Sequence, residues 1–259
     1  MYLIQEFLAI FSRSYIVTLF LRLCLYRFYT VFGGLMLHFI LPKSLMKLAF
    51  KFSLLGFNVY NTTEPEFDEL NNNRIEDFYE KETKGVFLFN HPSFLDSFTF
   101  ASVIDKDKIR PVVYRPYFRF PLHLFSDTFN PIYVKYGSTG VSTIIKDTIL
   151  SRQRKDKIIF IAPGGSDTNE SQRNMSKFRS GAFLAKSPIL PIIIRYSSNV
   201  NRWPILSSMI KRFIYITPVY FKIRVLDPIY PKENEELEDF KNRVKSAMEN
   251  VPYYENLKF

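Results

Sequence analysis

Short apolar runs rich in β-branched and aromatic residues recur along the chain after residue 85. Six of them have the length and composition of buried strands: 86–90, 110–114, 130–136, 157–163, 189–196 and 219–226. Two segments between them, 140–155 and 178–187, have helical character. Strands alternating with helices predict an α/β fold, a single domain with a central mixed β-sheet flanked by helices. In such a sheet, ligand sites gather at the strand ends.

The first sixty residues follow a different pattern, in which long apolar stretches carry scattered cations and one acid, Glu6. Their longest uncharged run, 28–42, is shorter than the roughly 18 residues of a comfortable spanning helix. This length favours an interfacial or re-entrant placement in a membrane. We therefore predict a membrane-associated helical segment at 1–60, followed by the α/β domain at 61–259.

The segment 41–57 has the pattern of a helix lying in an anionic membrane surface. At helical spacing, one face carries the cations Lys43, Lys47 and Lys51, and another carries the apolar residues Leu45, Leu48, Phe52 and Leu55. A surface helix packed on the protein's own core is the alternative. Behind it, residues 64–82 contain eight acids against Arg74 and Lys81, which predicts a solvated connection.

The net charge and the cysteine content indicate which binding partners and which cellular compartment to expect. A formal net charge of +10 with 17% aromatic residues indicates an anionic partner, either nucleic acid or a membrane surface. The N-terminal cations stand among aliphatic residues and no nucleic-acid-binding motif is present, so we expect a lipid bilayer and no nucleic acid. The single cysteine, Cys24, excludes a disulfide framework. We expect an intracellular membrane, with the domain facing a reducing compartment.

The clearest chemistry lies in the stretch NHPSFLD, residues 90–96, directly behind the first apolar run. On an ideal helix His91 and Asp96 would point about 140° apart, so they meet only if His91 precedes the helix and the chain folds back. Pro92 suits the first turn of that helix. A histidine can take a proton from an alcohol near neutral pH, and a carboxylate on its other ring nitrogen would orient it. The alternative is a hydrogen-bonded turn histidine beside a helix-start charge.

The same stretch resembles the N-H-x-S-x-x-D block of the glycerolipid acyltransferases, in which His and Asp form the catalytic dyad. Three further blocks follow in the family's order. Residues 114–136 are similar to the second block, with Lys135 where Arg is usual, and FIAPGGSDT stands where the family has F-P-E-G-T-R-S. SPILPIIIRY resembles the apolar V-P-[IV]-x-P block, and the segment between these last two resembles the family's lysine/glycine/alanine helix.

The resemblance implies that His91 and Asp96 are catalytic. The remaining candidates are substrate-binding residues: Asn90, Ser93, Arg115, Lys135, Gly164, Gly165, Ser166, Arg173, Lys177 and Arg179. The chemistry of the third block supports this, because consecutive glycines let backbone N–H groups approach a phosphate or an oxyanion, and the downstream cations can pair with phosphates. Gly164 and Asp167 replace the family's Glu and Arg, which leaves the acceptor open.

We therefore expect a membrane-associated acyltransferase that moves an acyl chain from acyl-CoA to a glycerolipid hydroxyl, with a lysophospholipid such as lysophosphatidic acid as the favoured acceptor. Acyl-CoA would be a co-substrate, and no metal or bound cofactor is expected. His38 and His123 are interpreted as packed or interfacial residues rather than metal ligands. The alternatives are an acyltransferase for neutral mono- or diacylglycerol, or a non-catalytic lipid-binding membrane protein with the same fold.

Overall fold

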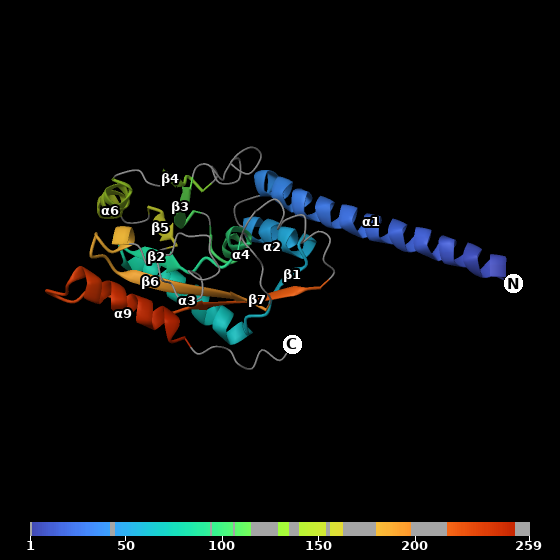
Figure 1. Ribbon diagram of the computed structural model, residues 1–259. Coiled ribbons are helices and arrows are strands. Elements are labelled where there is room, and N and C mark those ends of the chain that lie inside the picture. The colour runs from blue at the N-terminus through green and yellow to red at the C-terminus, as the bar shows by residue number, and fades with distance from the viewer. Residues whose placement is uncertain are drawn as a thin grey trace.

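The computed structural model describes residues 2–41, 45–93, 95–105, 107–114, 129–134, 140–153, 156–162, 180–197 and 217–251. Seven strands within these residues form one sheet in the order β1-β7-β6-β2-β5-β3-β4 (Figure 1). Their bounds are β1 Val59–Asn61, β2 Val86–Phe89, β3 Ile109–Tyr114, β4 Ile132–Val134, β5 Ile158–Ile161, β6 Ile189–Tyr196 and β7 Val219–Val225. Neighbouring strands are parallel except for the antiparallel pair β6–β7. The predicted mixed sheet and its six strands are confirmed, and β1 is an addition.

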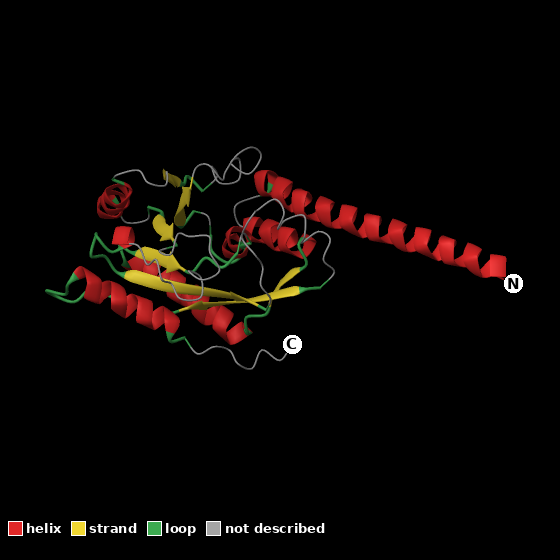
Figure 2. Cartoon of the chain, in the orientation of Figure 1, coloured by secondary structure: helices red, strands yellow, loops and turns green. Residues whose placement is uncertain are grey.

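Helices cover both faces of the sheet (Figure 2). Because side chains alternate along a strand, Phe87 and Phe89 of β2 enter one core and Val86 and Leu88 the other. The first core also receives side chains of α2 (Met46–Gly56), α3 (Pro65–Lys81) and α4 (Asp96–Ala101). The second receives those of α6 (Val141–Ser151) and α9 (Leu237–Glu249). The architecture is thus a three-layer α/β domain.

The acidic stretch predicted as a solvated connection is instead α3. Pro65 stands at its start, where a helix tolerates proline, and acids occupy its first turn. One narrow stripe, Asn71, Ile75 and Phe78, is buried. The Asn71 side chain donates to the carbonyl of Ile223 and accepts from the N–H of Val225, both at 2.8 Å. Since β1 pairs only with the first part of β7, this amide satisfies the strand edge that β1 leaves open.

Of the two predicted helices, the structure contains one and not the other. In 140–155 a helix is confirmed as α6, which ends at Ser151; residues 152–153 are not helical, and 154–155 lie outside the described residues. In 178–187, the described residues begin at 180 and form a single 3₁₀ turn, Ser180–Ala182, followed by turns, so a regular helix there is wrong. Phe183 directly after it is fully buried beside Phe240 of α9. The apolar residues that suggested a helix therefore anchor a short turn.

The N-terminal helix α1, Tyr2–Ile40, extends away from the sheet domain (Figure 1). Its C-terminal half packs closely on α2. A Cβ on Gly34 would lie 2.3 Å from Ser53 Oγ, and one on Gly56 would lie 2.8 Å from the carbonyl of Arg27, so only glycine permits this approach. Leu19–Leu37, 19 residues, is long and apolar enough to cross a membrane, by length and composition only.

The second helix packs on the sheet as well as on α1. Phe50, Leu54 and Phe57 join the core that contains the β2 and β6 side chains. The predicted division of the chain at residue 60 and the placement of 1–60 in a membrane stay predictions.

Candidate active site

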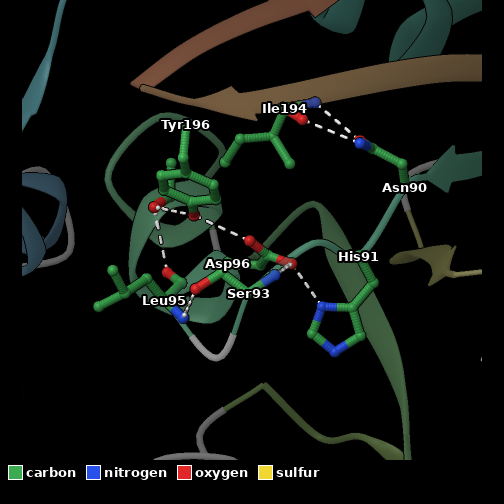
Figure 3. A network of polar contacts seen from close by, with 8 residues as sticks. Asn90, His91, Ser93, Leu95, Asp96, Ile194 and Tyr196 are labelled. Atoms are coloured by element: carbon green, nitrogen blue, oxygen red, sulfur yellow. Dashed lines mark hydrogen bonds and ion pairs between the residues drawn. The ribbon is translucent and has the colours of Figure 1, made fainter. Parts of the chain in front are cut away.

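The turn between β2 and α4 carries the predicted pair. Residues 90–93 are not helical and α4 begins at Asp96, so the prediction that Pro92 lies in the first helical turn is wrong. His91 precedes the helix, and the chain folds back so that its Nδ1 hydrogen-bonds Oδ2 of Asp96 (Figure 3). The two side chains whose spacing would separate them on one helix are therefore in contact.

The Asp96 carboxylate is only 1% exposed and depends on hydrogen bonds for its charge. Besides His91, Oδ2 accepts from the backbone N–H of Ser93 at 3.1 Å. The other oxygen, Oδ1, accepts from the hydroxyl of Tyr196 at 2.8 Å. A carboxylate that receives donors on both oxygens is held in one orientation, and that orientation presents Oδ2 to His91.

These contacts determine which nitrogen of His91 is free. A carboxylate only accepts, so Nδ1 carries the proton and Nε2 keeps its lone pair in the neutral ring. The His91 side chain is 32% exposed. Among the residues that the structure describes, none hydrogen-bonds Nε2, which lies on the side of the ring away from Asp96 (Figure 3). Nε2 is thus available to accept a proton from a bound hydroxyl group.

Asn90 and Ser93, predicted to bind substrate, hold the turn together. The Asn90 amide donates to the carbonyl of Ile194 at 2.8 Å and accepts from the Ile194 N–H at 2.7 Å. Ser93 is fully buried, and its Oγ accepts from the N–H of Leu95 at 3.1 Å. Their role toward a substrate stays a prediction, while their contacts with the protein position His91.

Tyr196, the last residue of β6, belongs to the site although no role was predicted for it. Its hydroxyl also lies 3.0 Å from Thr99 Oγ1. Burial, followed by the negative charge of Asp96, raises the pKa of Tyr196 well above its ordinary value, so the hydroxyl stays protonated. One signal was available in the sequence. The carboxyl ends of parallel strands meet at the same sheet edge, and Tyr196 ends one predicted strand while His91 directly follows another.

An aromatic cluster lies under the turn. The ring of Phe89 stacks on Phe160 with centroids 4.0 Å apart and meets Phe100 edge-on at 4.8 Å. The His91 ring lies 5.7 Å from Phe89. These packed rings give the imidazole a rigid apolar support on one side.

The other predicted substrate-binding residues lie outside the described residues: Arg115, Lys135, Gly164, Gly165, Ser166, Arg173, Lys177 and Arg179. The same holds for Asp167 and His123. Within the part of the chain that is described, no three His, Cys, Asp or Glu side chains gather in a way that could hold a metal ion. The absence of a metal or bound cofactor stays a prediction.

Comparison with known proteins connects this site to a family. A family model described as Acyltransferase matches residues 70–195, a range that includes β2, the His91 turn and nearly all of β6. The chain is 26% identical over 176 residues to "Lysophospholipid acyltransferase LPEAT1" of Arabidopsis thaliana. That alignment covers 62% of this chain and 42% of the relative, so this chain spans less than half of that protein's length.

A solved structure shares the fold. The crystal structure of the 1-acyl-sn-glycerophosphate (LPA) acyltransferase PlsC from Thermotoga maritima matches with a TM-score of 0.53 and 16% sequence identity. The match covers 88% of this chain and 92% of that one, so the two chains share a fold over most of their length.

Proposed function

Because this chain belongs to the glycerolipid acyltransferase family, we propose that it transfers an acyl chain from acyl-CoA to a hydroxyl group of a lysophospholipid such as lysophosphatidic acid. The observation that carries the proposal is the His91–Asp96 pair with Nε2 of His91 open to a ligand. The similarity to a lysophospholipid acyltransferase supports the choice of acceptor.

His91 and Asp96 are sufficient for the proton transfers of the proposed reaction. Nε2 of His91 removes the proton of the acceptor hydroxyl as its oxygen attacks the thioester carbonyl. Asp96 stabilises the imidazolium that forms. When the tetrahedral intermediate collapses, the carbon–sulfur bond breaks, the thiol takes the proton from His91, and an ester and free coenzyme A leave. Acyl-CoA is thus a co-substrate, and we propose no metal or bound cofactor.

Two binding roles are proposed from the sequence. The backbone N–H groups of Gly164 and Gly165 would stabilise the oxyanion. The cations Lys135, Arg173, Lys177 and Arg179 would pair with phosphates of the acceptor or of coenzyme A.

We also propose that the chain works on an intracellular membrane, in a reducing compartment. Support comes from the apolar stretch Leu19–Leu37 and from a row of exposed apolar side chains on α2. Both substrates carry acyl chains, so a bilayer would hold them beside the site.

The decisive experiment measures coenzyme A release and ester formation by the purified full-length chain, with and without lysophosphatidic acid. His91→Ala should abolish both while the circular dichroism spectrum is unchanged. Ser97→Ala, an exposed residue of the same α4, should retain activity and serves as the control. Full transfer by His91→Ala would contradict the role of His91. The same acyl chain on a carrier protein, offered in place of acyl-CoA, tests the donor.

The acceptor is tested separately with monoacylglycerol and diacylglycerol. If a phosphate is recognised, lysophosphatidic acid should be preferred and Lys135→Ala should raise its KM. A preferred neutral acceptor, with Lys135→Ala harmless, would show that the enzyme is a neutral-lipid acyltransferase. Binding of lipid with no transfer to any acceptor would favour a non-catalytic protein.

A further inference from the structure

Two side chains that lie far apart in the sequence, His91 and Tyr196, share one carboxylate. His91 and the Ser93 N–H bind Oδ2 of Asp96, and Tyr196 binds Oδ1 from β6 (Figure 3). The tyrosine is therefore the donor that fills the carboxylate oxygen turned away from His91.

The sheet register explains how Tyr196 reaches this position. β2 and β6 are parallel neighbours, with Phe89 opposite Ile192. Residues two apart on a strand share a face, so Ile192, Ile194 and Tyr196 all face the layer that contains α4. The Asn90–Ile194 hydrogen bonds then tie the turn to the same stretch of β6. The end of β6 thus holds both ends of the His91–Asp96 turn.

In the described residues, few other polar groups lie beside the hydrogen bond between Tyr196 and Asp96. In the described part of the chain, the titratable groups that bind Asp96 are His91 on the turn and Tyr196 on β6. The surrounding elements contribute apolar rings, Phe89 of β2, Phe160 of β5, and Phe57 after α2 against Phe98 of α4. The cations of α2 are engaged or exposed, with Lys47 paired to Asp105 at 3.5 Å and Lys51 on the surface.

We propose that Tyr196 is a positioning residue of this pair: its hydroxyl fixes the Asp96 carboxylate and weakens the pull of that carboxylate on the imidazole proton. A hydrogen bond to a carboxylate stabilises its negative charge, so the carboxylate stabilises a neighbouring imidazolium less. Removal of the Tyr196 hydroxyl should therefore strengthen the interaction between the Asp96 carboxylate and the imidazolium form of His91. The importance of this effect for catalysis rests on the proposed function, but the effect itself does not.

The test is a titration of the three histidines by NMR, in the full-length chain with isotope-labelled histidine in detergent micelles. His91→Gln identifies the His91 signal. In Tyr196→Phe we expect the midpoint of the His91 titration to rise by roughly half to one pH unit, the scale of a charge-assisted hydrogen bond shared within a pair. The control is Tyr60→Phe on β1, which removes a hydroxyl that donates a hydrogen bond to Asn58 at 3.0 Å. This variant should leave the His91 midpoint unchanged.

A second variant keeps the proposal testable if Tyr196→Phe does not fold. 3-Fluorotyrosine at position 196 keeps the size of the ring but donates a stronger hydrogen bond, so the His91 midpoint should fall. Unchanged midpoints in both variants, or shifts in the reverse directions, would overturn the proposal.

Kinetic measurements distinguish the positioning role of Tyr196 from the proposed acyl transfer. If acyl transfer occurs, Tyr196→Phe should lower kcat with little change in KM, and the acid limb of its pH–rate profile should move to higher pH. The limb moves this way because His91 must be neutral to act as the base. A wild-type chain without acyl transfer would overturn the proposed function and leave the NMR result standing. Normal transfer without the NMR shift would overturn only the role of Tyr196.

Discussion

Asn90 and Ile194 exchange two hydrogen bonds at the point where β2 ends. The Asn90 amide donates to the Ile194 carbonyl at 2.8 Å and accepts from the Ile194 N–H at 2.7 Å. The strand pairing itself ends one step earlier, at Phe89 and Ile192. The side-chain amide therefore continues the ladder past the last strand residue, and it does so at the residue before His91.

Replacing Asn90 with alanine should lower both stability and activity. The variant loses two hydrogen bonds and leaves both backbone groups of Ile194 without that partner, at a cost of about 1–3 kcal/mol in the free energy of unfolding. The transfer activity should fall by more than this loss of stability alone would cause, because the chain before His91 loses its attachment to β6. Denaturant unfolding in detergent and the transfer assay measure the two effects. Asn72→Ala, at an exposed position of α3, should change stability by less than about 0.5 kcal/mol. Equal stability of the two variants would contradict this role of Asn90.

Asp96→Asn should remove most of the transfer activity. An asparagine amide can donate to Nδ1 of His91, which would place the ring proton on Nε2 and eliminate the base. We expect kcat to fall about 10²- to 10⁴-fold. The comparison is Asp77→Asn, which breaks an exposed ion pair with Lys81 within α3 and should leave kcat unchanged. A kcat for Asp96→Asn close to that of the wild type would show that Asp96 does not orient the base.

Local features of this site were predictable, and long-range ones were not. His91 and Asp96 lie five residues apart, so their meeting depends only on the turn after a strand. Tyr196 lies 100 residues beyond Asp96, and the contact requires β2 and β6 to be neighbours, which no local pattern specifies. The helix α3 was missed for a different reason. Its buried stripe of Asn71, Ile75 and Phe78 is only one residue per turn among acids, and the average polarity hides it.

The loop before α9 provides a pH-dependent contribution to stability. Arg243 binds both carboxylate oxygens of Glu235, at 2.9 and 2.7 Å, and lowers the pKa of Glu235 from 4.5 to about 2. Because the folded pKa is depressed, the contribution is complete above pH 4.5 and is lost as the pH falls toward 2. Glu235→Gln should therefore lower the thermal midpoint at pH 7, with the difference shrinking at pH below 4.5.

Thermal unfolding in detergent at several pH values between 7 and about 3 tests this dependence. Glu233→Gln, an exposed glutamate of the same loop, is the matched control and should behave as the wild type. A difference for Glu235→Gln that stays constant across the range would mean that the lost side chain acts through packing and not through its charge.

Helix α2 is apolar on two sides, and among the described residues only one of these sides is buried in the core. Phe50 and Leu54 join the core of the sheet domain. The residues predicted to face a membrane, Leu45, Leu48, Phe52 and Leu55, are exposed. The alternative predicted for this segment, a surface helix packed on the core, accounts for the first side but not for the exposed apolar side chains of the second.

We expect the exposed row of α2 to contact lipid, because burial of apolar side chains is favourable and this row has no protein cover in the described residues. The experiment uses the full-length chain with Cys24→Ser and Leu48→Cys, labelled with a fluorophore and reconstituted into vesicles that contain a spin-labelled lipid. Leu48 is 58% exposed, and Tyr230, 50% exposed on the loop before α9, provides a matched site as Tyr230→Cys. The label at position 48 should be strongly quenched and the label at 230 weakly. Equal quenching at both sites would show that α2 does not select the lipid surface, whereas the expected contrast would place the helix that packs against α4, and with it the Asp96 end of the site, at the membrane where a lysophospholipid resides.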